Sequence, residues 1–291
     1  MPTSVLNPAG GEHVEVPRVA APPTPLAAGA PRRFRAVDGP WVVIPTYNEA
    51  GNLRGLVLRL MAALRDSGRD PFSILVVDDG SPDGTGLLAD RLGEDYPQVQ
   101  VLHRAAKAGL GAAYVAGFTV ALGHGASHVV QMDADLSHDP ADVPDMLDAT
   151  AHADVIIGSR YVAGGSTPDW GLKRRLLSRA GSFYARRLLD LPIRDLTGGF
   201  KCWSRRSLLG VGLGDVDAAG YVFQIEMTYR AVRNGARVAE MPIVFKDRTR
   251  GESKMSASIV REALLRVPQL RLRGVESPAH DALILEPAFA E

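Results

Sequence analysis

Short apolar runs alternate with amphipathic stretches from residue 41 to residue 272. The runs have the length of strands, and in the stretches between them apolar positions recur every three or four residues, as in helices. The expected strands are residues 41–44, 74–77, 99–103, 128–132, 154–157 and 237–245. The expected helices are residues 53–64, 85–92, 112–122, 172–189, 221–234 and 256–272. This alternation predicts an α/β fold with a mostly parallel sheet flanked by helices and amphipathic helices at the C-terminus.

The two ends of the chain differ from this pattern. Residues 1–38 are rich in Pro and Ala, which predicts a disordered tail. Residues 273–291 carry Pro278 and Pro287 and are expected to form a flexible C-terminal tail. A single domain is therefore expected at residues 39–272.

Composition narrows the classes of function. The 33 basic side chains balance 33 acidic ones, which argues against a nucleic-acid-binding protein. Cys202 is the single cysteine, so a reducing, cytoplasmic location is expected. The sequence lacks the run of about 18 apolar residues that a membrane-spanning helix needs.

Carboxylates follow the second expected strand. Asp78 and Asp79 stand at the buried end of an apolar run, where a charge costs several kcal/mol unless it is paired or binds a ligand. Ser81 and Pro82 suit the N-cap and first position of the next helix. Capping does not explain the two carboxylates, so this motif favours a ligand site.

Two further motifs end strands at the same expected edge of the sheet. Asp133, Ala134 and Asp135 follow the strand at residues 128–132, and two carboxylates around one small residue can bind a divalent cation such as Mg²⁺ or Mn²⁺. Glu49 follows the first strand, although Asn48 could equally cap the next helix. Open α/β sheets bind ligands at this edge.

A glycine-rich turn offers an alternative. Gly109 and Gly111 follow a strand, and Asp133 lies about 20 residues further on, as in a dinucleotide-binding fingerprint. The bulky Tyr114 stands where a close-packing Gly or Ala is needed. An oxidoreductase that uses NAD is therefore the weaker interpretation.

Taken together, the motifs resemble the dolichol-phosphate (polyprenol-phosphate) mannose synthases of the inverting family 2 glycosyltransferases. The resemblance covers residues 41 to about 260. It rests, in order along the chain, on Pro45-Thr46-Tyr47-Asn48-Glu49, Asp78-Asp79-Gly80-Ser81-Pro82-Asp83-Gly84-Thr85, Lys107-Ala108-Gly109-Leu110-Gly111, Asp133-Ala134-Asp135-Leu136-Ser137-His138, Gly158-Ser159-Arg160-Tyr161, Asp195-Leu196-Thr197-Gly198-Gly199-Phe200 and Gly251-Glu252-Ser253-Lys254.

The resemblance implies a GT-A fold and transfer of mannose from GDP-mannose to a polyprenyl monophosphate with inversion. It assigns the guanosine part of the donor to Pro45, Tyr47, Glu49, Val77 and Asp79. It assigns the sugar nucleotide to Asp133, Ala134 and Asp135, with Asp135 as the main ligand of Mg²⁺ or Mn²⁺ and Asp133 nearer the sugar or ribose. Some relatives have Gln where this chain has Ser137, which leaves the second protein ligand of the metal open.

The resemblance also implies an acceptor side. It assigns the phosphate groups of the sugar nucleotide to Arg160, Arg248 and Lys254, with Asp135 and Arg160 as the catalytic residues, and only the acceptor phosphate to Arg174 and Ser178. Because the acceptor is a lipid, peripheral attachment to the cytoplasmic face of the membrane is expected through residues 172–189, aided by residues 256–272 or by a membrane-anchoring partner protein. The closest alternatives are glucosyl and N-acetylhexosaminyl transfer from a UDP-sugar, followed by a catalytically silent module that binds sugar nucleotides.

Overall fold

The computed structural model describes residues 34–216, 220–247 and 257–273. Within them one sheet has the strand order β3-β2-β1-β4-β6-β5-β7. The strands are β1 (Gly39–Thr46), β2 (Ser73–Asp78), β3 (Val99–His103), β4 (Ala126–Gln131), β5 (Val155–Ser159), β6 (Lys201–Ser204) and β7 (Val238–Pro242). Only β6 pairs antiparallel to its neighbours among these strands. The predicted mostly parallel sheet is therefore confirmed.

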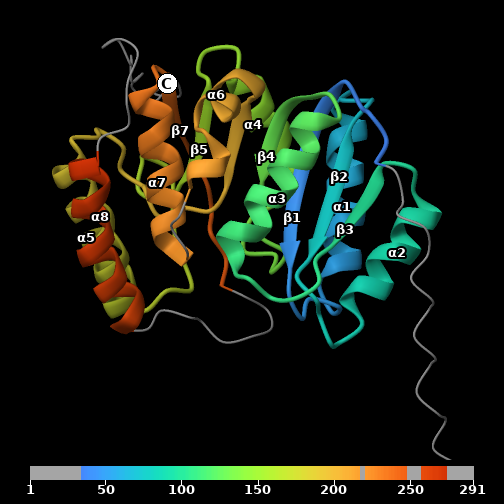
Figure 1. The fold of residues 1–291 in the computed structure, drawn as a ribbon, viewed down its shortest axis with the longest axis horizontal. Coiled ribbons are helices and arrows are strands. Elements are labelled where there is room, and N and C mark those ends of the chain that lie inside the picture. The colour runs from blue at the N-terminus through green and yellow to red at the C-terminus, as the bar shows by residue number, and fades with distance from the viewer. Residues whose placement is uncertain (1–33, 217–219, 248–256, 274–291) are drawn as a thin grey trace, which may run out of the picture. The chain divides into compact units, whose positions relative to one another are not determined.

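Helices cover both faces of the sheet (Figure 1). They are α1 (Leu53–Asp66), α2 (Thr85–Asp95), α3 (Leu110–Gly123), α4 (Val143–Ala149), α5 (Leu172–Leu189), α6 (Arg205–Gly210), α7 (Gly220–Arg233) and α8 (Ala257–Arg273), with 3-10 turns η1 (Pro140–Asp142) and η2 (Leu213–Asp215). One buried apolar cluster joins the sheet to α1, α2 and α4, and the other joins it to α3, α6 and α7. The second cluster also takes in Leu189 of α5 and Val267 of α8.

Strand β6 was not predicted, and its sequence shows why. It reads Lys-Cys-Trp-Ser, so a charged residue interrupts the apolar pattern. Lys201 is nevertheless fully buried, because its Nζ donates to the carbonyl oxygen of Gln224 at 2.8 Å and to Thr228 Oγ1 at 2.9 Å. A buried charge needs such partners, and no pattern of apolar positions could have shown them. Helices α4 and α6 were missed as well because each is short.

The ends of the central strands fix the position of the site. Thr46 at the end of β1 pairs in register with Asp78 at the end of β2. Strand β4 lies on the other side of β1 and pairs with it up to Gln131, two residues before Asp133. From β1 the chain runs outward to β2 and β3, and after β3 it returns to β4 on the other side of β1, which opens a crevice at the carboxyl edge of the sheet.

The second helix begins where it was predicted, but its predicted capping residues, Ser81 and Pro82, are wrong. Helix α2 begins at Thr85 with Gly84 as its N-cap in the left-handed region (φ 88°). Ser81 instead donates from Oγ to Asp78 Oδ1 at 2.5 Å and accepts from the backbone nitrogen of Asn48 at 3.1 Å. The hydroxyl satisfies a buried carboxylate, and this need outweighs helix capping. Likewise, Asn48 does not cap α1, whose N-cap is Asn52.

Residues 34–38, which the sequence places in the N-terminal tail, contact the sheet domain. Phe34 packs edge-on against His124 with ring centroids 5.5 Å apart. The backbone nitrogen of Val37 donates to the carbonyl of His124 at 2.8 Å, and Trp41 Nε1 donates to the carbonyl of Val37 at 3.0 Å. Residues 34–38 thus belong to the domain and not to the predicted tail.

A half-buried carboxylate before α4 gives a stability prediction. Burial, with repulsion from Asp139 and Asp145, raises the pKa of Asp142 to about 6. The folded protein then binds a proton between pH 4 and 6 that the unfolded chain releases, so Asp142 lowers stability as pH rises through this window. Asp142→Asn is expected to stabilise the protein at pH 7 by roughly 1 kcal/mol, after allowance for screening by solvent.

Urea unfolding at pH 7 and at pH 3.5 checks the prediction for Asp142. The stabilisation should largely vanish at the lower pH, where Asp142 is mostly protonated in both states. Asp66→Asn, in an exposed position at the end of α1, serves as the matched control because Asp66 does not affect the pKa of Asp142. A gain in stability that is equal at the two pH values would contradict the assignment.

Candidate active site

A cleft of about 380 Å³ opens at the carboxyl edge of β1, β2 and β4. The residues that line it are Pro45, Thr46, Tyr47, Glu49, Asp79, Lys107, Gly109, Leu110, Ala113, Asp133, Ala134, Asp135, Thr197, Gly199, Gly220 and Gln224. Seven of the predicted donor-binding residues are among them, from three segments that are far apart in the sequence. The crevice predicted from the sheet topology is therefore a cleft lined by carboxylates.

One end of the cleft lies over β1 and β2. Lys107 Nζ stands 3.6 Å from the centre of the Tyr47 ring, a cation–π contact. Glu49 Oε2 accepts from Asn52 Nδ2 at 2.9 Å, and its backbone nitrogen donates to Thr85 Oγ1 at 2.9 Å. These contacts hold an aromatic face and a carboxylate at the cleft, a combination that suits a base and a ribose.

The carboxylates after β2 have separate partners. Asp78 is held by the backbone nitrogen and hydroxyl of Ser81 and does not line the cleft. Asp79 lines it and accepts from Arg104 Nη1 at 2.6 Å and from the backbone nitrogens of Ala108 and Gly109 at 3.1 and 3.2 Å. Asp79 thereby fixes the loop that leads into α3, which forms one wall of the cleft.

Gly109 also decides between the two interpretations of the glycine-rich turn. In a dinucleotide fingerprint the backbone at the turn approaches a pyrophosphate. Here the nitrogen of Gly109 donates to the Asp79 carboxylate, and Tyr114 is fully buried. The turn therefore binds a carboxylate of the protein itself, which argues against the dinucleotide-binding interpretation.

Asp133 and Asp135 both line the cleft, and each accepts a hydrogen bond from a hydroxyl group. Tyr114 Oη donates to Asp133 Oδ1 at 2.7 Å. Ser137 donates to Asp135 Oδ1 from Oγ at 2.6 Å and from its backbone nitrogen at 3.0 Å. Burial, together with the charge of Asp133, raises the pKa of Tyr114 well above its usual range, so its phenol remains a donor.

The donor set fits a hard divalent cation only in part. Asp133 and Asp135 supply carboxylate oxygens, which Mg²⁺ and Mn²⁺ prefer. No cluster of three or more acidic, His or Cys side chains suited to a metal occurs within the described ranges. A cation here would take its remaining ligands from water and from a bound diphosphate, as Mg²⁺ commonly does.

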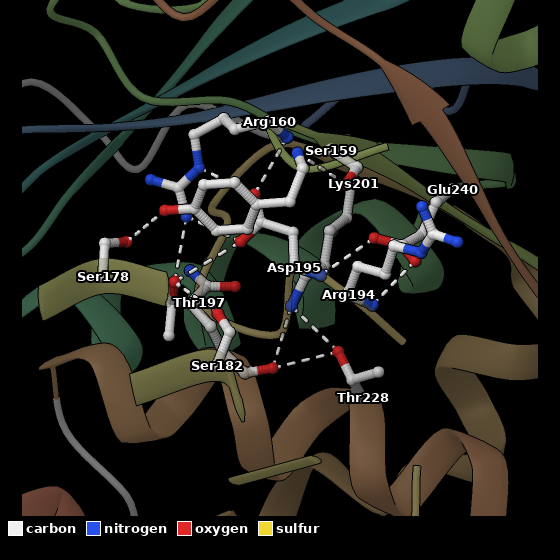
Figure 2. Close-up of polar contacts among 12 residues, drawn as sticks. Ser159, Arg160, Ser178, Ser182, Arg194, Asp195, Thr197, Lys201, Thr228 and Glu240 are labelled. Atoms are coloured by element: carbon white, nitrogen blue, oxygen red, sulfur yellow. Dashed lines mark hydrogen bonds and ion pairs between the residues drawn. The ribbon is translucent and has the colours of Figure 1, made fainter. Parts of the chain in front are cut away.

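Arg160 is the centre of a second buried group beside the cleft. Its Nε and Nη2 donate to Asp195 Oδ2 and Oδ1 at 2.7 and 2.6 Å, and Nη2 donates to Thr197 Oγ1 at 2.9 Å. Figure 2 shows this bidentate ion pair together with Lys201 and Glu240. Arg160 is 6% exposed and does not line the cleft. The guanidinium that was predicted to contact a phosphate is thus paired with Asp195.

The predicted acceptor residues lie on α5, beyond Arg160. Tyr161 Oη donates to Ser178 Oγ at 2.6 Å. Arg174 stands 4.0 Å from the centre of the Trp170 ring, and its Nη1 donates to both carboxylate oxygens of Asp247 at 2.9 and 3.0 Å. Arg248 and Lys254, the other predicted phosphate ligands, lie outside the described residues.

Comparison with known proteins identifies this arrangement. The profile described as Glycosyl transferase family 2 matches residues 41–211. The chain belongs to this family.

Two relatives of this family 2 glycosyltransferase are closely similar over most of their length. This chain is 48% identical to the polyprenol monophosphomannose synthase of Mycolicibacterium smegmatis, over 84% of its own length and 91% of that protein. It is 45% identical to the undecaprenyl-phosphate mannosyltransferase of Micrococcus luteus, over 77% of this chain and 90% of that protein. The resemblance to the polyprenol-phosphate mannose synthases is thereby confirmed.

Solved structures confirm the fold of the glycosyltransferase. A mannosyltransferase from Pyrobaculum calidifontis, in complex with GDP-mannose and Mn²⁺, aligns with a TM-score of 0.55 at 20% identity, over 84% of this chain and 66% of that one. A glucosyl-3-phosphoglycerate synthase from Mycobacterium tuberculosis, in complex with Mn²⁺, UDP-glucose and phosphoglyceric acid, aligns with a TM-score of 0.56 at 18% identity, over 81% of this chain and 79% of that one.

Some positions in this glycosyltransferase differ from the sequence-based picture. The side chain of Val77 is fully buried in the core and does not line the cleft, so a donor could meet only its backbone. Tyr114 and Gln224 reach the site without having been assigned a role, because a Tyr or Gln within a helical pattern carries no signal of its own. Thr197 and Gly199 belong to the motif at residues 195–200, and that motif was the signal that could have predicted them as cleft residues.

Proposed function

We propose that this enzyme transfers mannose from GDP-mannose to a polyprenyl monophosphate, with inversion at the sugar carbon. The observation that carries the proposal is the cleft, which brings carboxylates from β1, β2 and β4 to one site beside a buried arginine. The names of the two close relatives, a polyprenol monophosphomannose synthase and an undecaprenyl-phosphate mannosyltransferase, support the mannosyl group and the polyprenyl acceptor.

The proposed donor lies along the cleft from β2 to β6. Pro45, Tyr47, Glu49 and Asp79, with the backbone of Val77, hold the guanosine part over the first two strands. Asp133, Ala134 and Asp135 hold the diphosphate and the sugar, and Asp135 is the main ligand of Mg²⁺ or Mn²⁺. When bound, the cation neutralises the charge that develops on the departing diphosphate.

The chemistry that remains for the protein is mainly positioning. The acceptor phosphate is anionic at pH 7 and needs no strong general base before it attacks the sugar carbon. One of its oxygens forms the new bond on one face of that carbon as the bond to the diphosphate breaks on the other. Arg174 and Ser178 are proposed to hold this phosphate in line, and Arg160, Arg248 and Lys254 to hold the phosphate groups of the donor, since guanidinium groups bind phosphate bidentately.

Arg160 and Arg174 each form an ion pair with an Asp, and these pairs determine how the two arginines could bind phosphate. Asp195 orients the guanidinium of Arg160, so Arg160 would meet a phosphate with its geometry already fixed. The side chain of Arg174 is 22% exposed and pairs with Asp247, whose side chain is 40% exposed, so an incoming phosphate can reach this pair and compete with Asp247 for the guanidinium. Preorganised charge of this kind costs little reorganisation during the reaction.

A panel of nucleotide sugars tests the donor. We expect GDP-mannose with a short polyprenyl phosphate and Mn²⁺ or Mg²⁺ to give polyprenyl-phosphate mannose, and UDP-glucose and UDP-N-acetylglucosamine to react at least a hundredfold more slowly. NMR of the product should show a β linkage. Faster transfer from a UDP-sugar, or an α-linked product, would contradict the proposal.

An apolar surface on α5 and α8 supports attachment to a membrane. Leu172, Leu176 and Phe183 of α5 are 69%, 58% and 59% exposed, and Leu272 of α8 is 85% exposed. Tyr184 Oη donates to the carbonyl of Leu264, which joins the two helices. Exposed basic residues of α5, among them Lys173, Arg179 and Arg187, flank these side chains.

A helix pair with this surface suits the interface of an anionic bilayer. The described helices include none that is apolar over the length needed to cross a bilayer. We therefore propose peripheral attachment on the cytoplasmic face, with a membrane-anchoring partner protein as an additional attachment.

Flotation with anionic liposomes measures this attachment. The double variant Leu172→Glu/Leu176→Glu is expected to bind at least tenfold more weakly, because each buried Leu contributes about 1.5–3 kcal/mol. Leu209→Glu is the matched control, since Leu209 is 56% exposed on the separate helix α6. Equal flotation of the double variant and the wild type would show that α5 does not hold the protein on the membrane.

A further inference from the structure

Three buried side chains form a chain of hydrogen bonds beneath the cleft. Trp203 Nε1 of β6 donates to Gln131 Oε1 of β4 at 3.3 Å. Gln131 Nε2 in turn donates to Gln224 Oε1 of α7 at 2.8 Å. Trp203 and Gln131 are fully buried, and Gln224 is 2% exposed where it lines the cleft.

The direction of this chain follows from its first member. An indole nitrogen can only donate, so Gln131 must turn its carbonyl oxygen toward Trp203 and its amide nitrogen toward Gln224. Gln224 must then accept through Oε1. Its Nε2 is left as a hydrogen-bond donor with a fixed direction, because reversing either amide would place two like groups in contact.

The backbone of Gln224 is fixed as well. Lys201 Nζ and Thr228 Oγ1 donate to its carbonyl oxygen at 2.8 and 3.0 Å. Lys201 belongs to β6, so this contact ties α7 to the sheet at the level of the cleft. A side chain held at both its backbone and its amide oxygen is preorganised for recognition.

Gln224 and Asp133 approach the same point in the cleft. A Cβ atom added to Gly199 would lie 3.6 Å from Gln224 Nε2 and 3.3 Å from Asp133 Oδ2. Asp133 Oδ1 accepts from Tyr114, so the oxygen that faces Gly199 is the other one. The missing side chain of Gly199 therefore leaves space between an N–H donor and a carboxylate acceptor.

A hydroxyl group matches this pair, because it can donate to Asp133 while it accepts from Gln224. The position along the cleft indicates which hydroxyl group. With the nucleoside over β1 and β2 and the diphosphate at Asp135, the hexose lies toward β6 and α7, where Gln224 stands. Metal-bound phosphate oxygens have no proton to donate to Asp133, so they could match only Gln224, the donor of the pair.

We propose that Gln224 and Asp133 together bind one hydroxyl group of the donor's hexose, which makes Gln224 a determinant of sugar specificity. Gln131 and Trp203 are positioning residues that fix the direction of the Gln224 amide. This inference rests on the proposed function, since it requires a nucleotide hexose in the cleft.

Kinetics with monodeoxy analogues of GDP-mannose test the inference, with wild-type protein and Gln224→Leu. The variant should lose about 10- to 100-fold in kcat/KM with GDP-mannose, as expected for a lost hydrogen bond to a substrate hydroxyl. One deoxy analogue should then react equally well with the variant and the wild type, because the contact is already absent. Gln131→Met should show the same pattern more weakly.

Two further measurements separate recognition from a structural effect. The affinity for GDP, which lacks the hexose, should change by less than twofold in Gln224→Leu. The isosteric Gln224→Glu, which keeps the acceptor for Gln131 but removes the N–H donor, should show the same dependence on the deoxy analogues. A loss that is uniform across all analogues, or a matching loss of GDP affinity, would overturn the inference while leaving the proposed function intact. A wild-type protein inactive with GDP-mannose would instead overturn the proposed function and this inference with it.

Discussion

Asp135→Ala is expected to reduce mannosyl transfer about a thousandfold while the protein remains folded. The carboxylate is the proposed main ligand of the cation, and stabilising the departing diphosphate is worth several kcal/mol, or about 4 kcal/mol for a thousandfold effect. Asp135 is buried, and two hydrogen bonds to its carboxylate come from Ser137, a nearby residue of the same loop. Its removal should therefore disturb the loop and spare the sheet.

Initial rates at saturating GDP-mannose and Mn²⁺ measure this effect. Asp145→Ala is the matched control, because Asp145 is an exposed carboxylate ten residues further along the chain that does not line the cleft. It should retain activity within twofold of the wild type. An Asp135→Ala enzyme with more than a tenth of the wild-type rate would remove Asp135 from the metal site.

Asp195→Ala is expected to lower the free energy of unfolding by about 3–5 kcal/mol, which corresponds to a fall in Tm of roughly 10 °C. Asp195 is fully buried and accepts three hydrogen bonds from Arg160, including one from its backbone nitrogen at 3.0 Å. Without the carboxylate, a buried guanidinium loses its counter-charge. Thermal unfolding followed by circular dichroism measures the change.

The exposed ion pair between Arg69 and Asp148 supplies the contrast. Asp148 is 68% exposed in this pair, so Asp148→Ala should cost at most about 1 kcal/mol. Although burial alone would raise the pKa of Asp195, the charge and hydrogen bonds of Arg160 lower it overall. The stabilisation by Asp195 is therefore present above about pH 4 and is lost as pH falls through its lowered pKa. An Asp195→Ala protein with a Tm within 2 °C of the wild type would contradict the structural importance of the pair.

The sheet and its ligand-binding edge could be predicted from the sequence because both follow local rules. Apolar runs of strand length and the carboxylates directly after them, such as Asp79 and Asp135, are read from neighbouring residues. The pairing of Arg160 could not be predicted in this way, because Asp195 lies 35 residues further along the chain. Arg160 was expected to be a phosphate ligand, and its fixed partner is visible only in the folded protein.

Burial of polar groups explains the other differences. Lys201 is charged by type and so argues against a strand, yet hydrogen bonds from its ammonium group allow β6 to lie inside the sheet. Tyr114 reads as a core aromatic residue, and it does stack on Phe118 and Phe223, but its hydroxyl also holds Asp133. Contacts of this kind depend on tertiary structure and leave no pattern in the sequence.

Transfer of labelled mannose from GDP-mannose to polyprenyl phosphate, with the purified protein before and after chelation by EDTA, tests the central claim most directly. We predict a lipid-linked labelled product that is lost in EDTA and restored by excess Mn²⁺. Failure to label the lipid phosphate, or a rate that EDTA leaves unchanged, would contradict a metal-dependent polyprenyl-phosphate mannosyltransferase.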